Sequence, residues 1–431
     1  MAVYFVFFMN SKVDILLGLQ WGDEGKGKIV DLLSPQYDMI ARFQGGPNAG
    51  HTLSFDEKKF ILHSIPSGVF QESCMNYIGN GVVLDPIVFK KEIEMLLPLA
   101  SWIYSTLYIS KQTHLILPTH RLLDAATEQS KGKGKIGSTL KGIGPAYTDK
   151  IARQGIRVGD IGLPTFKQKY EALVKYHAQL LSMLSFKNEF ESMEKEWFDS
   201  LQELAKFKQC DGISFIQEQI HKGKHILAEG AQGSMLDIDF GSYPFVTSSN
   251  TIAAGACTGL GIAPSQTGNV IGVTKAYCTR VGSGPFPTEL NDATGEALRQ
   301  HGNEYGSTTG RPRRCGWLDL VALKQAVTIN GVHRLIITKA DVMSSLDEIK
   351  VAIAYKTPNG DILHVPYTYD DIMEPVYKTF KGWQKDISHA HKKEELPNEL
   401  LRYINFIEEY VGIHVELVSV GPDRNANVVI R

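Results

Sequence analysis

The sequence is poor in cysteine, in long apolar runs and in excess charge. Its 431 residues include only five cysteines, which are widely spaced and never form a C-x-x-C pair. Neither a disulfide framework nor a zinc knuckle is therefore expected, and a reducing, cytoplasmic compartment is the natural expectation. No segment reaches the roughly 18 apolar residues of a membrane-spanning helix, and the apolar stretch 1–9 lacks the features of a signal peptide.

Opposite charges are nearly balanced along the chain. Its 45 basic and 47 acidic side chains leave a formal net charge of −2. This balance excludes a general polyanion-binding surface, so neither nucleic acid nor a membrane is an expected partner, although local basic pockets remain open. With 43% hydrophobic and 21% charged residues, the composition is that of an ordered globular protein.

Short apolar runs recur along the chain, with glycine-rich loops or helical stretches between them. We expect strands at 13–17, 39–43, 76–83, 225–227, 270–274, 334–338 and 414–418. Alternation of this kind predicts an α/β fold with a large, mostly parallel central sheet and flanking helices.

Two other segments predict additions to the sheet. Residues 166–208 contain neither glycine nor proline and carry apolar residues at helical spacing, so we expect a helical insert, within about 100–210. An Asn359-Gly360 pair between two apolar runs predicts a peripheral β-hairpin over 351–365. No long linker interrupts the chain, which favours a single domain over 13–431. Residues 1–12 are interpreted as an N-terminal extension; an extra edge strand is the alternative.

The segment Gly22-Asp23-Glu24-Gly25-Lys26-Gly27-Lys28 follows a predicted strand and opens a predicted helix. That placement suits a loop whose backbone N–H groups bind phosphate. The spacing fits G-x-x-x-x-G-K, but Ile29 stands where an ordinary P-loop has Ser or Thr to hold magnesium. Asp23 is therefore the candidate that binds a cation or exchanges a proton. The alternative is an ordinary glycine-rich turn with solvated charges.

A second glycine-rich loop, 44–51, follows the next predicted strand and ends in Asn48-Ala49-Gly50-His51. We expect it at the same edge of the sheet, which would place His51 near Asp23. A histidine there could donate a proton to a phosphoryl oxygen as charge develops. A purely structural hydrogen-bonding role is an equal alternative for His51 taken singly.

The apolar run 335–338 ends in Thr338-Lys339-Ala340-Asp341, which is similar to the guanine-selecting motif of GTP-binding proteins. Guanine offers two adjacent donors that one carboxylate can accept, whereas adenine would leave a buried Asp341 unpaired. Sites of this kind discriminate by roughly 10⁴-fold. A chance match is the alternative, since four-residue patterns are common.

Two basic stretches rich in glycine and hydroxyl residues, 306–314 and 131–139, show no apolar periodicity. The arginines of the first suit carboxylates or phosphates, and we expect the loop to close on a ligand. The lysines of the second are interpreted as phosphate-facing. The alternative for both is a solvated basic loop.

Taken in order, the motifs QWGDEGKGK, NAGH, IGPAY, EGAQG, YPFVTSSN, TRVGSGPFPTE and VGPDR resemble the adenylosuccinate synthetase family, from about residue 13 to 424. The resemblance implies a C–N bond-forming ligase that joins IMP and L-aspartate to adenylosuccinate, with GTP converted to GDP and phosphate. It further implies a 6-phosphoryl-IMP intermediate and a place at the first committed step from IMP to AMP in purine biosynthesis.

The resemblance also implies roles for single residues. Asp23 would be the base that removes the N1 proton of IMP, and His51 the acid at the γ-phosphoryl group. Asp23 and the Gly50 carbonyl would hold one Mg²⁺ per subunit. Arg153 would reach the IMP bound by the partner of a homodimer.

Substrate contacts follow from the same resemblance. The expected GTP contacts are Gly22, Asp23, Glu24, Gly25, Lys26, Gly27, Lys28, Gly50, Arg313, Lys339, Ala340, Asp341, Ser419, Val420 and Gly421. The expected IMP contacts are Asp23, Glu24, Gly25, Lys26, Asn48, Ala49, Gly50, His51, Thr139, Arg153, Gln232, Thr247 and Arg311. Aspartate would be bound by Ser307, Thr308, Thr309, Gly310, Arg311, Pro312 and Arg313.

The chain departs from the family pattern at Pro47, at Leu140 and Lys141, at Pro312 and at Val420. None of these positions carries a proposed catalytic group. Pro312 would stiffen the aspartate loop. Two competing hypotheses are a regulatory GTPase, which would need no pockets for other substrates, and a P-loop kinase, which would release a phosphorylated product.

Overall fold

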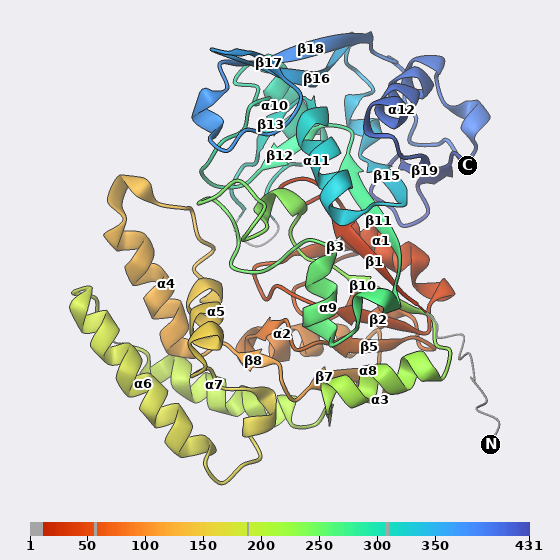
Figure 1. The fold of residues 1–431 in the computed structure, drawn as a ribbon. Helices are drawn as coiled ribbons and strands as arrows, with labels where there is room; N and C mark the ends of the chain where they lie inside the picture. The colour runs from red at the N-terminus through yellow and green to blue at the C-terminus, as the bar shows by residue number, and fades with distance from the viewer. Residues whose placement is uncertain (1–11, 56–57, 188, 307–309) are drawn as a thin grey trace, which may run out of the picture.

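A ten-stranded sheet runs through the computed structural model, which describes residues 12–55, 58–187, 189–306 and 310–431 (Figure 1). Its strand order is β20-β19-β15-β11-β1-β10-β2-β5-β7-β9, and all neighbours are parallel except β19 and β20. The strands are β1 (Val13–Gly18), β2 (Met39–Arg42), β5 (Met75–Ile78), β7 (Leu107–Ser110), β9 (Lys208–Cys210), β10 (Ile226–Glu229), β11 (Thr267–Lys275), β15 (Arg334–Thr338), β19 (Val415–Ser419) and β20 (Asn427–Val429).

The expected α/β class and parallel sheet are confirmed, and one predicted strand is wrong in extent. The run 76–83 is two strands, because β5 ends at Ile78 and Val83–Leu84 form β6, which pairs with β8 (His114–Leu115). Gly79 and Gly81 lie between them. A Cβ at Gly81 would lie 1.9 Å from the Phe43 carbonyl oxygen, so only glycine allows the chain to pass there.

The central strands are apolar on both faces because helices cover both sides of the sheet. In β1, Ile15 and Leu17 belong to the larger core, whereas Leu16 faces Ile29 and Val30 of α1 in a separate cluster. The longer helices are α1 (Lys26–Leu33), α2 (Pro86–Leu96), α4 (Pro118–Ser130), α5 (Ile143–Ala152), α6 (Phe166–Met183), α7 (Glu191–Leu204), α8 (Gly212–His221), α9 (Ala254–Leu260), α10 (Ala293–His301), α11 (Leu320–Asn330) and α12 (Asn398–Val411). A single turn, α3 (Ile103–Thr106), precedes β7.

The helices of the predicted insert lie together on one side of the molecule (Figure 1). Tyr170 and Leu173 of α6 pack with Trp197 and Leu201 of α7 in a second apolar core. The same stretch of chain also supplies β7 and the edge strand β9, which apolar periodicity did not reveal. Predicted segment 1–12 lies outside the described residues, apart from Lys12.

The predicted hairpin is confirmed. Strands β16 (Glu348–Thr357) and β17 (Gly360–Ile362) are antiparallel, and Gly360 has a φ of 108°, which glycine adopts without strain. This small sheet also contains β14 (Leu318–Asp319) and β18 (Glu374–Lys381). The remaining strand pairs are β3 (His51–Phe55) with β4 (Lys58–Leu62), and β12 (Cys278–Arg280) with β13 (Arg314–Gly316).

Among the helices of the described residues, none combines the length and apolarity needed to cross a bilayer. All five cysteines lie in the described part of the chain and are free thiols.

Candidate active site

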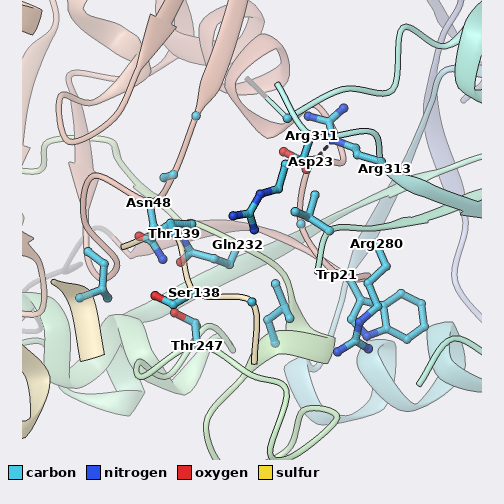
Figure 2. Close-up of a pocket in the computed structure, with 18 of the residues that line it drawn as sticks. Trp21, Asp23, Asn48, Ser138, Thr139, Gln232, Thr247, Arg280, Arg311 and Arg313 are labelled. Carbon is cyan, nitrogen blue, oxygen red and sulfur yellow. Dashed lines mark ion pairs between the residues drawn. The ribbon is translucent and has the colours of Figure 1, made fainter. Parts of the chain in front are cut away.

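A cleft of about 1290 Å³ opens where the central parallel strands end. It is lined by the loops that follow β1, β2, β10, β15 and β19, which is where doubly wound α/β folds bind ligands. Figure 2 shows Asp23, Asn48 and Gln232, from the loops after β1, β2 and β10, around this cleft. The predicted residues that line it are Gly22, Asp23, Gly25, Lys26, Gly27, Lys28, Asn48, Ala49, Gly50, His51, Thr139, Gln232, Thr247, Arg311, Arg313, Lys339, Asp341, Ser419 and Gly421.

Other predicted site residues lie elsewhere. Glu24, Ala340 and Val420 are buried behind the loops that line the cleft. Arg153 is exposed at the end of α5. Gly310 and Pro312 are exposed beside the cleft, and Ser307, Thr308 and Thr309 lie outside the described residues.

Glu24 holds the predicted phosphate-binding loop, residues 22–28 (the phosphate loop), in shape from inside. Its buried carboxylate accepts hydrogen bonds from the backbone N–H groups of Gln20 and Gly22, at 3.1 and 2.9 Å, and from Lys26 Nζ at 2.6 Å. Gly22 and Gly25 both have a φ of 85°, which lets the chain turn tightly before α1 begins at Lys26. The helix then points its N-terminus into the cleft, where an anion is favoured.

Lys28 occupies the lysine position of the P-loop pattern, but its ammonium group points to another loop. Lys28 Nζ donates to Ser419 Oγ and to the carbonyl oxygens of Gly421 and Ala426, at 2.7, 2.7 and 3.0 Å. Burial lowers its pKa to about 8. In this structure Lys28 therefore ties α1 to the loop after β19, and Lys26 is the cation nearer the start of the phosphate loop.

His51 is held by a carboxylate that the sequence did not single out. His51 Nδ1 lies 2.5 Å from Glu229 Oε1, and Ser67 donates its N–H and its hydroxyl to the same carboxylate at 2.8 and 2.6 Å. Burial lowers the pKa of His51 to about 4, so the imidazole is neutral and Nδ1–H donates to Glu229. His51 Nε2 is buried and meets no hydrogen-bond partner within the described chain.

The Glu229 carboxylate is ionised. Burial opposes its charge, but His51, Arg42 and Ser67 outweigh burial and hold its pKa at about 2. Glu229 ends β10 and opens the EGAQG motif, but no role was predicted for it from the sequence.

Asp23 forms an ion pair with Arg313, whose Nε lies 2.8 Å from Asp23 Oδ2 (Figure 2). Arg313 also contacts Glu304, with Nη1 at 2.6 Å from Oε2. The loop 22–28 and the cationic segment before β13 are therefore in direct contact. The two sequence motifs gave no sign of this contact.

The predicted guanine-selecting residues lie at another wall of the cleft. Lys339 has a φ of 59° and donates from Nζ to the Gly302 carbonyl at 2.6 Å and to Glu304 Oε1 at 2.8 Å. Burial raises the pKa of Asp341, and its Oδ1 is buried without a hydrogen-bond partner among the residues described.

Orphaned polar atoms gather in this cleft. Besides Asp341 Oδ1 and His51 Nε2, the buried amide of Gln232 and Asn48 Oδ1 are also without partners in the described ranges. Buried polar groups are rarely left unsatisfied, so such a cluster indicates groups that a ligand completes.

The basic loop after α4 is held by acidic side chains of that helix. Glu128 accepts from the N–H groups of Gly137 and Ser138 at 2.9 and 3.1 Å, and Asp124 accepts from Ser138 Oγ at 2.6 Å. Lys131 and Thr139 line the cleft, whereas Lys135 is exposed and is not part of its lining.

Two sets of residues could hold a metal. His120, Asp149 and His177 are buried close together, yet both imidazole Nε2 atoms lie 2.9 Å from Asp149 Oδ2, so these groups already satisfy one another. Their nitrogen donors also suit zinc better than magnesium. Asp23 and the Gly50 carbonyl are oxygen donors of the same cleft, and Mg²⁺ is commonly held by few protein oxygens plus phosphates and water. These two residues therefore fit Mg²⁺.

Arg280 also lines the cleft, though its role there is largely in support. Its guanidinium donates to Ser242 Oγ and to the carbonyls of Pro285 and Phe245 at 2.7 to 2.9 Å, and it lies 5.5 Å from the ring of Trp21 (Figure 2). Burial lowers its pKa to about 10. Arg280 therefore helps to hold the Trp21 side chain in place beside the phosphate loop.

Known proteins match this chain over nearly its whole length. The family described as adenylosuccinate synthetase matches residues 15–428. The adenylosuccinate synthetase of Parabacteroides distasonis is 56% identical over 418 residues, which cover 97% of this chain and 99% of that protein. The one from Cytophaga hutchinsonii is 57% identical over 423 residues, covering 97% and 98%.

Two solved structures share the architecture. Fully ligated adenylosuccinate synthetase from Plasmodium falciparum has a TM-score of 0.92 at 40% identity, covering 98% of this chain and 100% of that one. Cyanophage S-2L succinoaminodeoxyadenylate synthetase has a TM-score of 0.63 at 19% identity, covering 97% and 95%, a likeness of fold alone.

Proposed function

The chain belongs to the adenylosuccinate synthetase family, ligases of purine biosynthesis that join IMP and L-aspartate with GTP, and we propose that the cleft described above performs this reaction. The observation that carries the proposal is that Asp23 and His51, from the loops after β1 and β2, line one cleft together with Asp341. A base, an acid and a guanine acceptor are thereby available to the same substrates.

The chemistry begins by activating the 6-oxygen of IMP, a poor leaving group. Asp23 accepts the N1 proton, the O6 atom attacks the γ-phosphorus of GTP, and the bond to the β–γ bridging oxygen breaks to give GDP and 6-phosphoryl-IMP. His51 Nε2, protonated once the triphosphate is bound, donates to the transferring phosphoryl group. General acid–base help of this kind contributes about 10²–10⁴-fold.

The second half of the reaction forms the new C–N bond. The amine of aspartate attacks C6 of 6-phosphoryl-IMP, the C6–O6 bond breaks, and inorganic phosphate leaves with the proton that the amine loses. Arg311 and Arg313 offer guanidinium groups that suit the carboxylates of aspartate, and the segment 307–310 between the loop's ends would complete that site.

Asp23 and the Gly50 carbonyl would hold Mg²⁺ beside the phosphates of GTP. When bound, it would neutralise charge on the phosphates and polarise the γ-phosphoryl group. Asp23 would then exchange its present ion pair with Arg313 for the cation and for the purine N1 proton.

GTP and IMP are proposed to bind to different parts of the cleft lining. GTP would contact the phosphate loop at one end and Lys339 to Asp341 with Ser419 to Gly421 at the other. IMP would lie over Asp23 to Lys26 and Asn48 to His51, where the unsatisfied groups of Asn48 and Gln232 offer it hydrogen bonds. Thr139 and Thr247 lie on the same lining.

We propose that the active enzyme is a homodimer in which Arg153 reaches the partner's IMP. Arg153 is exposed at the C-terminal end of α5, between Ala152 and Gln154 at the border of the cleft, and neighbouring Ile151 is 77% exposed although apolar. We further propose a cytoplasmic location, in keeping with the free thiols.

The test incubates the protein with GTP, Mg²⁺, IMP and aspartate and follows the ultraviolet absorbance of adenylosuccinate. Product and phosphate should appear only when all four are present. Hydrolysis of GTP that is unaffected by omitting IMP and aspartate would favour a regulatory GTPase. Release of a stable phosphorylated nucleotide in the complete mixture would favour a kinase.

A further inference from the structure

A single buried carboxylate, Glu304, stands behind two walls of the cleft. Its side chain is fully buried, and it precedes the segment 306–313. No motif in the sequence marks it, and the mechanism above gives it no role.

Glu304 is surrounded by cations from separate parts of the chain. Its Oε1 accepts from Lys275 Nζ at 2.9 Å, from Lys339 Nζ at 2.8 Å and from the Tyr277 hydroxyl at 2.5 Å. Its Oε2 accepts from Arg313 Nη1 at 2.6 Å. Lys275 ends β11, Lys339 follows β15, and Arg313 precedes β13, so one side chain joins three segments.

The same residue also closes the base of the cationic loop through its backbone. The N–H of Arg313 donates to the Glu304 carbonyl at 2.9 Å, and Gly306 N–H donates to the Arg311 carbonyl at 2.8 Å. Glu304 and Arg313 are therefore joined twice, by backbone and by side chain.

Two of these cations, Lys339 and Arg313, line the cleft, and their charged groups meet at the Glu304 carboxylate. Lys339 belongs to the guanine-selecting segment, and its ammonium group is held at Glu304 and the Gly302 carbonyl. Arg313 directs its Nε to Asp23 in the phosphate loop. Arg313 is buried, so losing the Glu304 charge would be costly for it, and half-buried Lys339 would lose the carboxylate that holds its ammonium group. The positions of both cations therefore depend on the Glu304 charge.

We propose that Glu304 is a positioning residue for the nucleotide: it sets Lys339 at the guanine end and Arg313 at the phosphate end from one buried point. This inference rests on the proposed function, because that function places GTP between these two side chains. The carboxylate touches no substrate and acts only through the groups it holds. Lys275 is the cation that secures Glu304 itself to the sheet.

The experiment compares binding of a non-hydrolysable GTP analogue with binding of IMP, each measured by calorimetry. Glu304→Gln keeps the shape of the side chain and removes its charge. We expect the dissociation constant of the analogue to rise at least tenfold and that of IMP to change less than twofold. Tyr277→Phe, which removes one donor to Glu304, should weaken the analogue about threefold in the same selective way. Glu304→Asp, which keeps the charge, should recover part of the affinity.

Glu408→Gln is the matched control. Glu408 is a nearly buried carboxylate on α12, held by the Val415 N–H and Arg431 far from the cleft, so neutralising it reports the general cost of losing such a charge. It should leave both affinities unchanged. The proposal would be overturned if Glu304→Gln weakened the binding of the GTP analogue and of IMP equally, or weakened neither. If Glu304→Gln does not fold, the selectivity of Tyr277→Phe and Glu304→Asp decides in the same way.

The outcome is separable from the proposed function. A wild-type protein that binds the analogue but forms no adenylosuccinate contradicts the proposed reaction and leaves the test of Glu304 intact. Normal synthesis with an unselective Glu304→Gln variant contradicts the positioning role alone.

Discussion

His51 Nδ1 and Glu229 Oε1 lie 2.5 Å apart, although 178 residues separate the two side chains in sequence. Strands β2 and β10 are neighbours in the sheet, so the loop after β2 folds back over the end of β10. The contact fixes the imidazole with Nδ1 toward the protein and leaves Nε2 for a ligand.

Replacing Glu229 by Gln should therefore impair turnover more than binding. The amide cannot hold the imidazole as an anion does, so we expect kcat to fall about 10²-fold, within the range of acid–base catalysis. KM for GTP and IMP should change less than threefold. Steady-state kinetics measures both. Glu92→Gln is the control, since Glu92 is a buried carboxylate on α2 that holds backbone N–H groups of 63–65 and should leave kcat unchanged. Wild-type kcat in the Glu229 variant would refute the orienting role.

Binding of the triphosphate should draw a proton onto His51. Burial lowers the pKa of this imidazole to about 4, so it is neutral at pH 6. Negative phosphates beside Nε2 favour the charged form and raise the pKa, so the complex takes up protons. Calorimetry at pH 6 in two buffers of different ionisation enthalpy should show uptake approaching one proton per site. His51→Asn should abolish it, and an enthalpy independent of buffer in the wild type would contradict the assignment.

The same depressed pKa has a defined effect on stability. The unfolded chain binds a proton at His51 below about pH 6.5, but the folded chain does so only below about 4. Unfolding therefore takes up a proton between these values, and the free energy of unfolding contributed by this group falls as pH drops from 6.5 to 4. His51→Asn should make the loss of thermal stability over this interval shallower than in the wild type. An identical dependence of thermal stability on pH in the two proteins would contradict the lowered pKa of His51.

Asp341→Asn should change the nucleotide preference of the enzyme from GTP to XTP. Its Oδ1 atom is buried and lacks a hydrogen-bond partner among the described residues, so it is ready to accept from the adjacent donors of guanine. An asparagine amide offers one donor and one acceptor, which matches the N1–H and 2-carbonyl of xanthine. We expect kcat/KM for GTP to fall at least 10³-fold and use of XTP to appear. Unchanged use of GTP in the coupled assay would remove Asp341 from base recognition.

Asp23→Asn should abolish synthesis while the fold persists. Asparagine cannot accept the N1 proton, and it is a weaker cation ligand than a carboxylate. We expect kcat to fall by at least 10³-fold, with circular dichroism and thermal unfolding close to the wild type because Asp23 is not part of the core. Thermal unfolding of the variant serves as the internal control for folding. Appreciable turnover in this variant would require another base.

The sequence determined the elements that depend on local patterns. Apolar runs placed the strands β1, β2, β10, β11, β15 and β19, because strands covered on both faces must be apolar throughout. The glycine spacing of 22–28 and the Thr338 to Asp341 segment marked the ends of the cleft, since turns that bind anions or bases need particular residues at fixed offsets. Strand β7 and the edge strand β9 are short and partly polar, and they left no such trace.

Only the tertiary structure decided which side chains the buried charged groups contact. Glu229 behind His51, Glu304 behind Lys339 and Arg313, and Lys28 on the loop after β19 are all pairs distant in sequence or unmarked by any motif. Strand order brings them together, and a buried ion accepts whichever opposite charge the topology places within reach. That choice depends on long-range packing, because the cost of burying a charge is met only where the folded chain supplies its partner.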